Sequence, residues 1–97
     1  MEHAELAAWL RLDQTPGIGN AAARRAGDEA LLHQVRLDDV FHGVARFRER
    51  GGDRLEAYRP TVELLDEKGE DVAVGLVEAA FVDLEKRERA LEVLSGQ

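Results

Sequence analysis

Apolar residues recur every three or four positions along much of the chain, which predicts a mainly helical protein. The first such stretch runs from Ala4 to about Leu12, with Trp9 as its largest apolar residue. The clearest stretch covers 76–95 and predicts an amphipathic terminal helix. Its apolar residues at helical spacing are Leu76, Val77, Ala80, Phe81, Leu84, Leu91 and Leu94.

Turn and capping residues divide the intervening chain into shorter helices. Asn20 is placed to cap a second helix, because an Asn side chain accepts hydrogen bonds from the first free amides. Gly27 followed by Asp28 predicts a break and a new start, and Gly51-Gly52 predicts a helix end. The helices expected in this region cover 20–26, 29–35 and a stretch to 49 that Asp38 or Asp39 caps, followed by one or two turns over 53–58.

Residues 61–75 fit two structures. β-Branched residues alternate with others on both sides of a turn that ends at Gly69, as in a β-hairpin. The competing structure is a helix that ends at Gly69. The alternation and the β-branched content favour the hairpin. The predicted fold is therefore mainly α: a single domain over 1–97, built as a small bundle of four to six short helices with a β-hairpin at about 61–75.

The composition is that of a small folded domain. A chain of 97 residues supports one modest core, and no apolar run approaches the ~20 residues that cross a bilayer. The amino terminus lacks the basic start and apolar block of a secretory signal, so we expect a cytoplasmic protein without membrane contact. The net charge is -7, and residues 60–97 hold four basic and ten acidic side chains, whereas 1–26 are neutral. We therefore expect any nucleic-acid contact at the front of the chain.

The strongest candidate site is the segment TPGIGNAAARR at 15–25, where a Pro-Gly turn, an apolar residue and a second glycine lead into Ala and Arg. A hairpin of this kind between two helices directs main-chain NH groups outward, and the positive end of the following helix favours an anion. Arginines just beyond it add ionic contacts to a phosphate. The predicted DNA-phosphate-binding residues are Gly17, Ile18, Gly19, Arg24 and Arg25.

Residues 6–25 read LAAWLRLDQTPGIGNAAARR, which resembles the amino-terminal segment of the DNA-processing protein A (DprA/Smf) family. Members open with a Leu/Trp-rich helix, a TPGIG or TPGVG hairpin and an Ala-Arg-Arg continuation. The segment is also similar to the helix-hairpin-helix motif, in which a small residue, here Ala23, follows the second glycine by four positions. The resemblance implies a non-catalytic helix-hairpin-helix over 1–26 that contacts DNA without reading its base sequence.

The likeness to that family ends at Arg25. The chain continues with Ala26-Gly27-Asp28, where family members have two large apolar residues and a Phe-Gly pair. It also has neither the length nor the motif for the family's large nucleotide-fold domain. Only the hairpin and its phosphate contact are therefore expected to carry over.

A second hypothesis uses the terminal helix. Its apolar face serves a protein partner or self-association instead of the chain's own core, so the protein is a helical interaction or assembly component. Residues 79–96 are similar to the carboxy-terminal region of flagellar rod proteins, although this helix is more charged and the first helix is shorter. The predicted interface residues are Leu76, Phe81, Leu84 and Leu91.

No catalytic, metal or cofactor site is expected. The three histidines, His3, His33 and His42, lack the spacing of zinc ligands, and a calcium loop that begins at Asp66 fails at its third and sixth positions. The one serine, Ser95, lies in no nucleophile-elbow signature, and neither a P-loop nor a GxGxxG string is present. These absences favour a protein that is not an enzyme.

One basic and aromatic patch remains, in the middle of the chain. As a nucleic-acid contact it would extend the surface that the hairpin begins. Acidic residues interleave with it, however, and favour a solvated, largely neutralised face. The patch consists of Arg46, Phe47, Arg48, Arg50, Arg54 and Tyr58.

Overall fold

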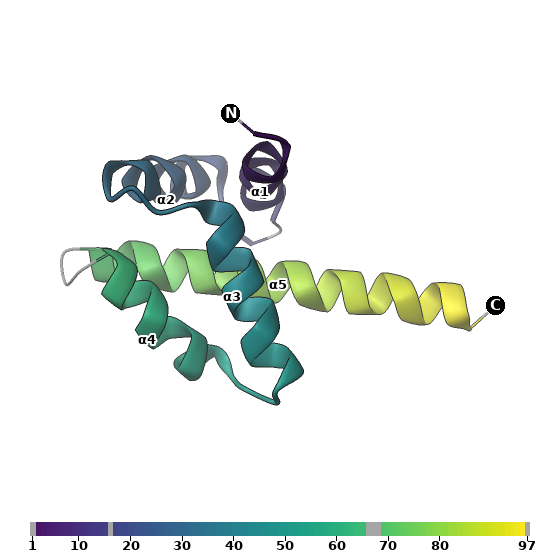
Figure 1. The fold of residues 1–97 in the computed structure, drawn as a ribbon. Helices are drawn as coiled ribbons and strands as arrows, with labels where there is room; N and C mark the ends of the chain where they lie inside the picture. The colour runs from purple at the N-terminus through teal and green to yellow at the C-terminus, as the bar shows by residue number, and fades with distance from the viewer. Residues whose placement is uncertain (1, 16, 66–68, 97) are drawn as a thin grey trace.

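The computed structural model describes residues 2–15, 17–65 and 69–96, and over these ranges the chain forms five helices and no strand (Figure 1). The mainly helical bundle predicted from apolar spacing is confirmed. No helix in the described part of the chain combines the length and the hydropathy that a bilayer crossing requires. The helices are α1 (His3–Asp13), α2 (Asn20–Leu32), α3 (Leu37–Glu49), α4 (Arg54–Leu65) and α5 (Glu70–Ser95).

Helix α5 is the central support of the fold. Its 26 residues span about 39 Å at 1.5 Å per residue, in a molecule that measures 46 × 26 × 25 Å. The other four helices all contact it, and they cover its first half (Figure 1). From Lys86 to Gly96 every residue is exposed, because this end projects beyond the rest of the bundle.

The core lies between α5 and the helices that cover it. The largest fully buried side chains are Phe81, Leu12, Leu37, Leu65, Leu76 and Val44.

The β-hairpin predicted at 61–75 is wrong. Residues 61–65 end α4 and residues 70–75 begin α5, while 66–68 lie outside the described residues. Ala57, Thr61 and Leu65 are buried at intervals of four residues, which places them on one helical face. Helix α4 therefore continues through Pro60, although an interior proline costs about 3 kcal/mol, because packing against α5 outweighs local propensity.

The break expected at Gly27 is also wrong, because α2 runs through this position without interruption. Gly27 is buried, and a Cβ atom there would lie 2.5 Å from Cη2 of Trp9. The glycine therefore lets the indole ring of α1 lie directly on the backbone of α2. Its role is close packing between two helices and not the termination of one.

Helix α3 begins with a cap supplied from α1. The two carboxylate oxygens of Glu5 accept hydrogen bonds from Leu37 N at 2.9 Å and Asp38 N at 3.2 Å. Asp38 and Asp39, which the sequence predicts as alternative caps, lie inside the first turn of α3 instead. Long-range capping thus satisfies two of the free amides at this helix start and ties α1 to α3.

The ends of α2 and α3 have the same geometry. Val35 N donates to Ala30 O at 2.7 Å, across Gln34, which has a φ of 58°. At the end of α3 the corresponding left-handed residue is Gly51, with a φ of 79°, so the helix end predicted at Gly51-Gly52 is confirmed. Both ends are Schellman motifs, and α2 places glutamine where glycine is the usual residue.

Candidate functional site

The turn between α1 and α2 is fixed from inside by Thr15. Its side chain is buried, and its Oγ1 donates to the Arg11 carbonyl oxygen at 2.6 Å. The Thr15 carbonyl oxygen in turn accepts a hydrogen bond from Ile18 N at 3.4 Å. Gly17 has a φ of 83°, a left-handed conformation that favours glycine, and Pro16 lies outside the described residues. The turn therefore requires the first glycine of the motif.

The start of α2 leaves main-chain NH groups without an acceptor in the helix. Gly17 and Gly19 are exposed, while Ile18 is half-buried against the core and its amide is used within the turn. The first helical bond of α2 runs from Ala23 N to Gly19 O at 2.9 Å, so the three preceding helical amides have no acceptor within their own helix. The cap position is Gly19, which has no side chain to serve them; Asn20, the predicted cap, is the first helical residue.

Arg24 and Arg25 lie one turn further along α2, and both are exposed. Over the described residues, neither makes an ion pair shorter than 4.0 Å. They share a shallow groove with Asp28 and Glu29, which moderates the local positive charge. Arg24 and Arg25 therefore lie in one groove with the first residues of α2, whereas Gly17, Ile18 and Gly19 line another.

A second groove separates the hairpin from α5. Gly17, Ile18 and Gly19 line one side, and Glu78 is the acidic residue among those that line the other. The Glu78 Oε2 atom lies 2.7 Å from Nη1 of Arg54, so its charge is already paired. This pairing limits the repulsion between the α5 carboxylate and an anion at the hairpin.

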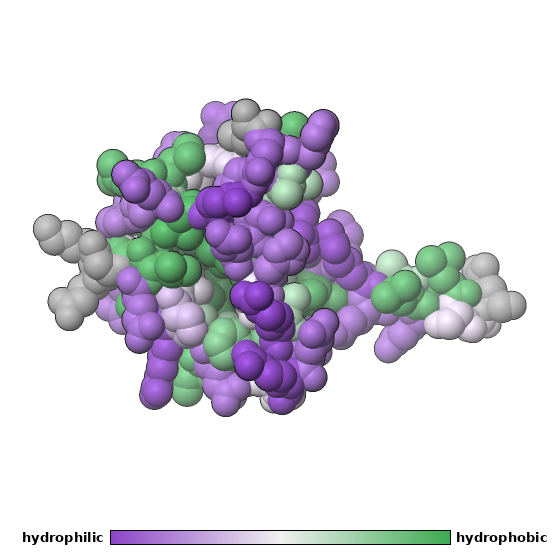
Figure 2. All heavy atoms as spheres, viewed as in Figure 1, coloured by the Kyte–Doolittle hydropathy of each residue, from purple (hydrophilic) through white to green (hydrophobic). Residues whose placement is uncertain are grey.

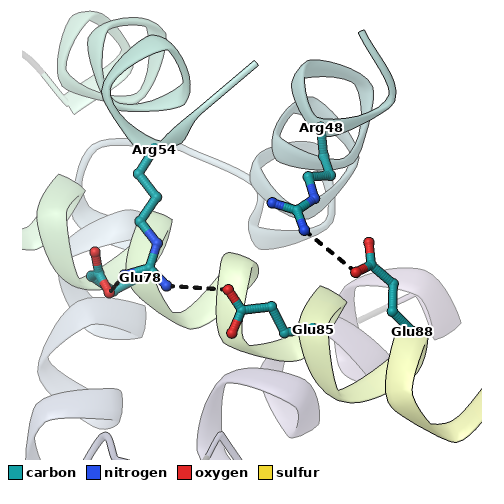
Figure 3. Close-up of polar contacts among 5 residues, drawn as sticks. All are labelled: Arg48, Arg54, Glu78, Glu85 and Glu88. Atoms are coloured by element: carbon teal, nitrogen blue, oxygen red, sulfur yellow. Dashed lines mark hydrogen bonds and ion pairs between the residues drawn. The ribbon is translucent and has the colours of Figure 1, made fainter. Parts of the chain in front are cut away.

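The acidic face of α5 is neutralised by arginines of the middle of the chain (Figure 3). Arg54 also approaches Glu85 Oε1 at 3.4 Å, and Arg48 lies 3.4 Å from Glu88 Oε2. Two of the four arginines in the basic and aromatic patch predicted over residues 46–58, Arg48 and Arg54, are therefore paired, and their acidic partners come from α5. These contacts join α3 and α4 to α5 across more than twenty residues of sequence.

A basic groove between α1 and α5 has no counterpart in the sequence analysis. Arg11, Gln14 and Thr15 line it on one side, and Asp83, Lys86 and Arg87 on the other. Nη2 of Arg11 lies 2.7 Å from Asp83 Oδ2, and Arg87 Nε lies 3.2 Å from the same oxygen. Arg11 and Asp83 are 72 positions apart, so no local motif identifies the pair. We call this surface the α1–α5 groove.

The predicted interface on the terminal helix needs a correction. Leu76 and Phe81 are 1% and 2% exposed and belong to the chain's own core, so they are not available to a partner. Leu84 is half-buried, and Leu91 is 65% exposed on the projecting end of α5. Val93 and Leu94 are exposed beside it, and Figure 2 shows this end as an apolar tip apart from the main body.

The described residues contain no cluster of three or more His, Cys, Asp or Glu side chains that would hold a metal ion. Comparison of the chain with protein-family models, with curated proteins and with solved structures finds no match. The resemblance of residues 6–25 to the DNA-processing protein A family therefore remains an expectation from the sequence. Any assignment of function rests on the geometry of the hairpin, the grooves and the projecting helix.

Proposed function

We propose that this protein is a non-catalytic helix-hairpin-helix-like module that contacts the phosphate backbone of DNA without sequence specificity. The observation that carries the proposal is the exposed turn at Gly17 and Gly19, which leads into helical amides without an internal acceptor. Such a helix start attracts an anion through its NH groups and the partial positive charge of the helix. Arg24 and Arg25, exposed and without an ion pair within the described residues, supply the charge that retains a phosphate.

The distribution of charge supports this proposal better than the net charge of -7 does. The acidic residues 60–97, which oppose DNA when read from the sequence, include three glutamates of α5 that pair with Arg48 and Arg54. Binding should nevertheless be weak, because one hairpin makes few phosphate contacts. It should also weaken as salt is added, since log K falls against log salt with a slope of about 0.9 for each contact.

The test is a titration by fluorescence anisotropy, with labelled duplex and single-stranded DNA at about 50 mM salt. Arg24→Glu should abolish binding to either probe. Arg59→Glu is the matched control, because Arg59 is exposed on α4, away from the hairpin, and the substitution changes the net charge equally. Absence of wild-type binding, or equal losses in the two variants, would refute the proposal.

One further observation favours a second function, self-association through α5. Leu91, Val93 and Leu94 are 64–69% exposed on a helical end that no other helix of the described chain covers. An isolated helix end is marginally stable in water, so a partner helix would stabilise it and bury these residues. We propose a second copy as that partner. Light scattering should give a dimer or larger species that Leu91→Asp converts to a monomer; a monomeric parent protein would exclude this function.

A further inference from the structure

We infer that the α1–α5 groove is a second phosphate-binding surface, on which a nucleic-acid strand continues from the hairpin. This inference deepens the proposed function and rests on it. Thr15 is common to both surfaces: it lines the groove, and its side chain and carbonyl oxygen fix the turn that exposes the glycines. Thr15 is itself buried, so it fixes the position of the groove relative to the turn and leaves contact with a strand to the exposed residues on either side.

The charge of the groove fits a phosphate backbone. Three cationic side chains, Arg11, Lys86 and Arg87, face one carboxylate, Asp83. Both arginines contact the same oxygen of that carboxylate, and Lys86 makes no ion pair shorter than 4.0 Å with the described residues. The local charge is therefore about +2 in a protein of net charge -7, because one carboxylate is shared between two guanidinium groups.

The groove is also held in place before any ligand binds. The Arg11 guanidinium lies 4.4 Å from the centroid of the Phe41 ring and donates through Nε and Nη2 to Asp83. Arg11 is thus an anchored group, whereas Lys86 and Arg87 are more exposed, and Arg87 is held only through Asp83. We assign direct phosphate contact to Lys86 and Arg87 and a positioning role to Arg11.

Helix α5 separates its charges in a way that suits this arrangement. Glu78, Glu85 and Glu88 pair with arginines of α3 and α4, as Figure 3 shows, while Lys86 and Arg87 lie in the groove beside α1. Lys86 and Arg87 therefore form a basic patch beside α1, while Glu78, paired with Arg54, lies in the groove against the hairpin. Glu85 and Glu88 still lie within a Debye length of about 10 Å of the basic residues, and their pairing with arginines of α3 and α4 reduces the repulsion they exert on a phosphate.

The experiment measures the slope of log K against log salt for wild type and variants, using the same duplex probe. This slope is negative, and removing one side chain that binds a phosphate should lower its magnitude by about 0.9. Lys86→Ala should lower it by about 0.9 and Lys86→Ala with Arg87→Ala by about 1.8, while Arg59→Ala leaves it unchanged. Circular dichroism checks that the variants remain folded, and Asp83 keeps its ion pair with Arg11 in each of them.

The possible results separate this inference from the function on which it rests. If wild type binds and Arg24→Glu abolishes binding, but the groove variants keep the wild-type slope, the second surface is refuted and the hairpin contact stands. If the groove variants lower the slope while Arg24→Glu binds normally, the hairpin contact is refuted instead. If Arg59→Ala lowers the slope as much as Lys86→Ala, the binding is not localised to the groove and the inference fails.

Discussion

Replacing Gly19 with aspartate should stabilise the fold and abolish DNA binding at the same time. Gly19 occupies the cap position of α2 with φ -65° and ψ 154°, the extended conformation of a capping residue. No atom lies within 4 Å of a Cβ added there, so a side chain fits without strain. Helix α2 has no side-chain cap and no acidic residue in its first turn. Gly19→Asp supplies a capping side chain and a negative charge at the start of this helix.

The expected gain follows from three contributions. An aspartate cap is better than a glycine cap by a few tenths of a kcal/mol, and a negative charge at a helix start contributes about 0.3 to 1 kcal/mol. Removing a glycine lowers the entropy of the unfolded chain, which contributes about 0.4 to 1 kcal/mol. We therefore expect the free energy of unfolding to rise by about 1 kcal/mol and the melting temperature by about 4–8 °C.

The same substitution should remove the phosphate site, because the carboxylate occupies the helix amides and repels a second anion. Thermal unfolding by circular dichroism and anisotropy titration on one preparation measure both effects. Gly19→Ala is the control: it leaves the amides free, so binding should persist. Its stability should change little, because alanine is a poorer cap than glycine and this loss offsets the entropic gain. A melting temperature that does not rise would refute the assigned start of α2, and retained binding would refute a phosphate site at this helix start.

Three further outcomes follow from local geometry. Gly27→Ala should destabilise by about 1–3 kcal/mol in urea unfolding, because the new methyl group overlaps the Trp9 ring; a gain in stability would mean that the two helices are further apart. Gln34→Gly should stabilise by about 0.5–1 kcal/mol, since glycine adopts the left-handed φ without strain, and a decrease in the same assay would contradict the Schellman motif. A hydrogen bond from the Tyr58 hydroxyl to Glu70 Oε1 at 2.8 Å raises the pKa of this single tyrosine above 10.0. Ultraviolet titration should show Glu70→Gln lowering that pKa, because the acceptor loses its charge.

The helices were predictable from the sequence because the spacing of apolar residues is a local property. Their interruptions were not, because the effect of a glycine or proline depends on what packs against it. Gly27 suggests a helix end, yet here it accommodates Trp9, and Pro60 suggests a boundary, yet α4 passes through it to bury Thr61 and Leu65. In both places tertiary contact outweighs the preference of the residue.

The two candidate surfaces also differ in how far the sequence predicts them. The hairpin was predictable because its glycines and arginines lie within one short segment. The α1–α5 groove was not, because Arg11 and Asp83 meet only after α5 folds back on α1. Periodicity identifies the residues on one face of the terminal helix, but it does not reveal which of them the chain covers itself. The prediction of a partner interface at Leu76 and Phe81 is wrong for this reason, and Leu91 remains available for one.

The position of α5 as the element that every other helix contacts has a consequence for biosynthesis. A nascent chain emerging from the ribosome presents α1 to α4 while their main packing surface is still inside the exit tunnel. Only the few contacts of those helices with one another, such as the Glu5 cap on α3, are available at that stage. Completion of the native structure should therefore wait until α5 has left the exit tunnel, and chaperones that shelter exposed apolar segments would act in that interval.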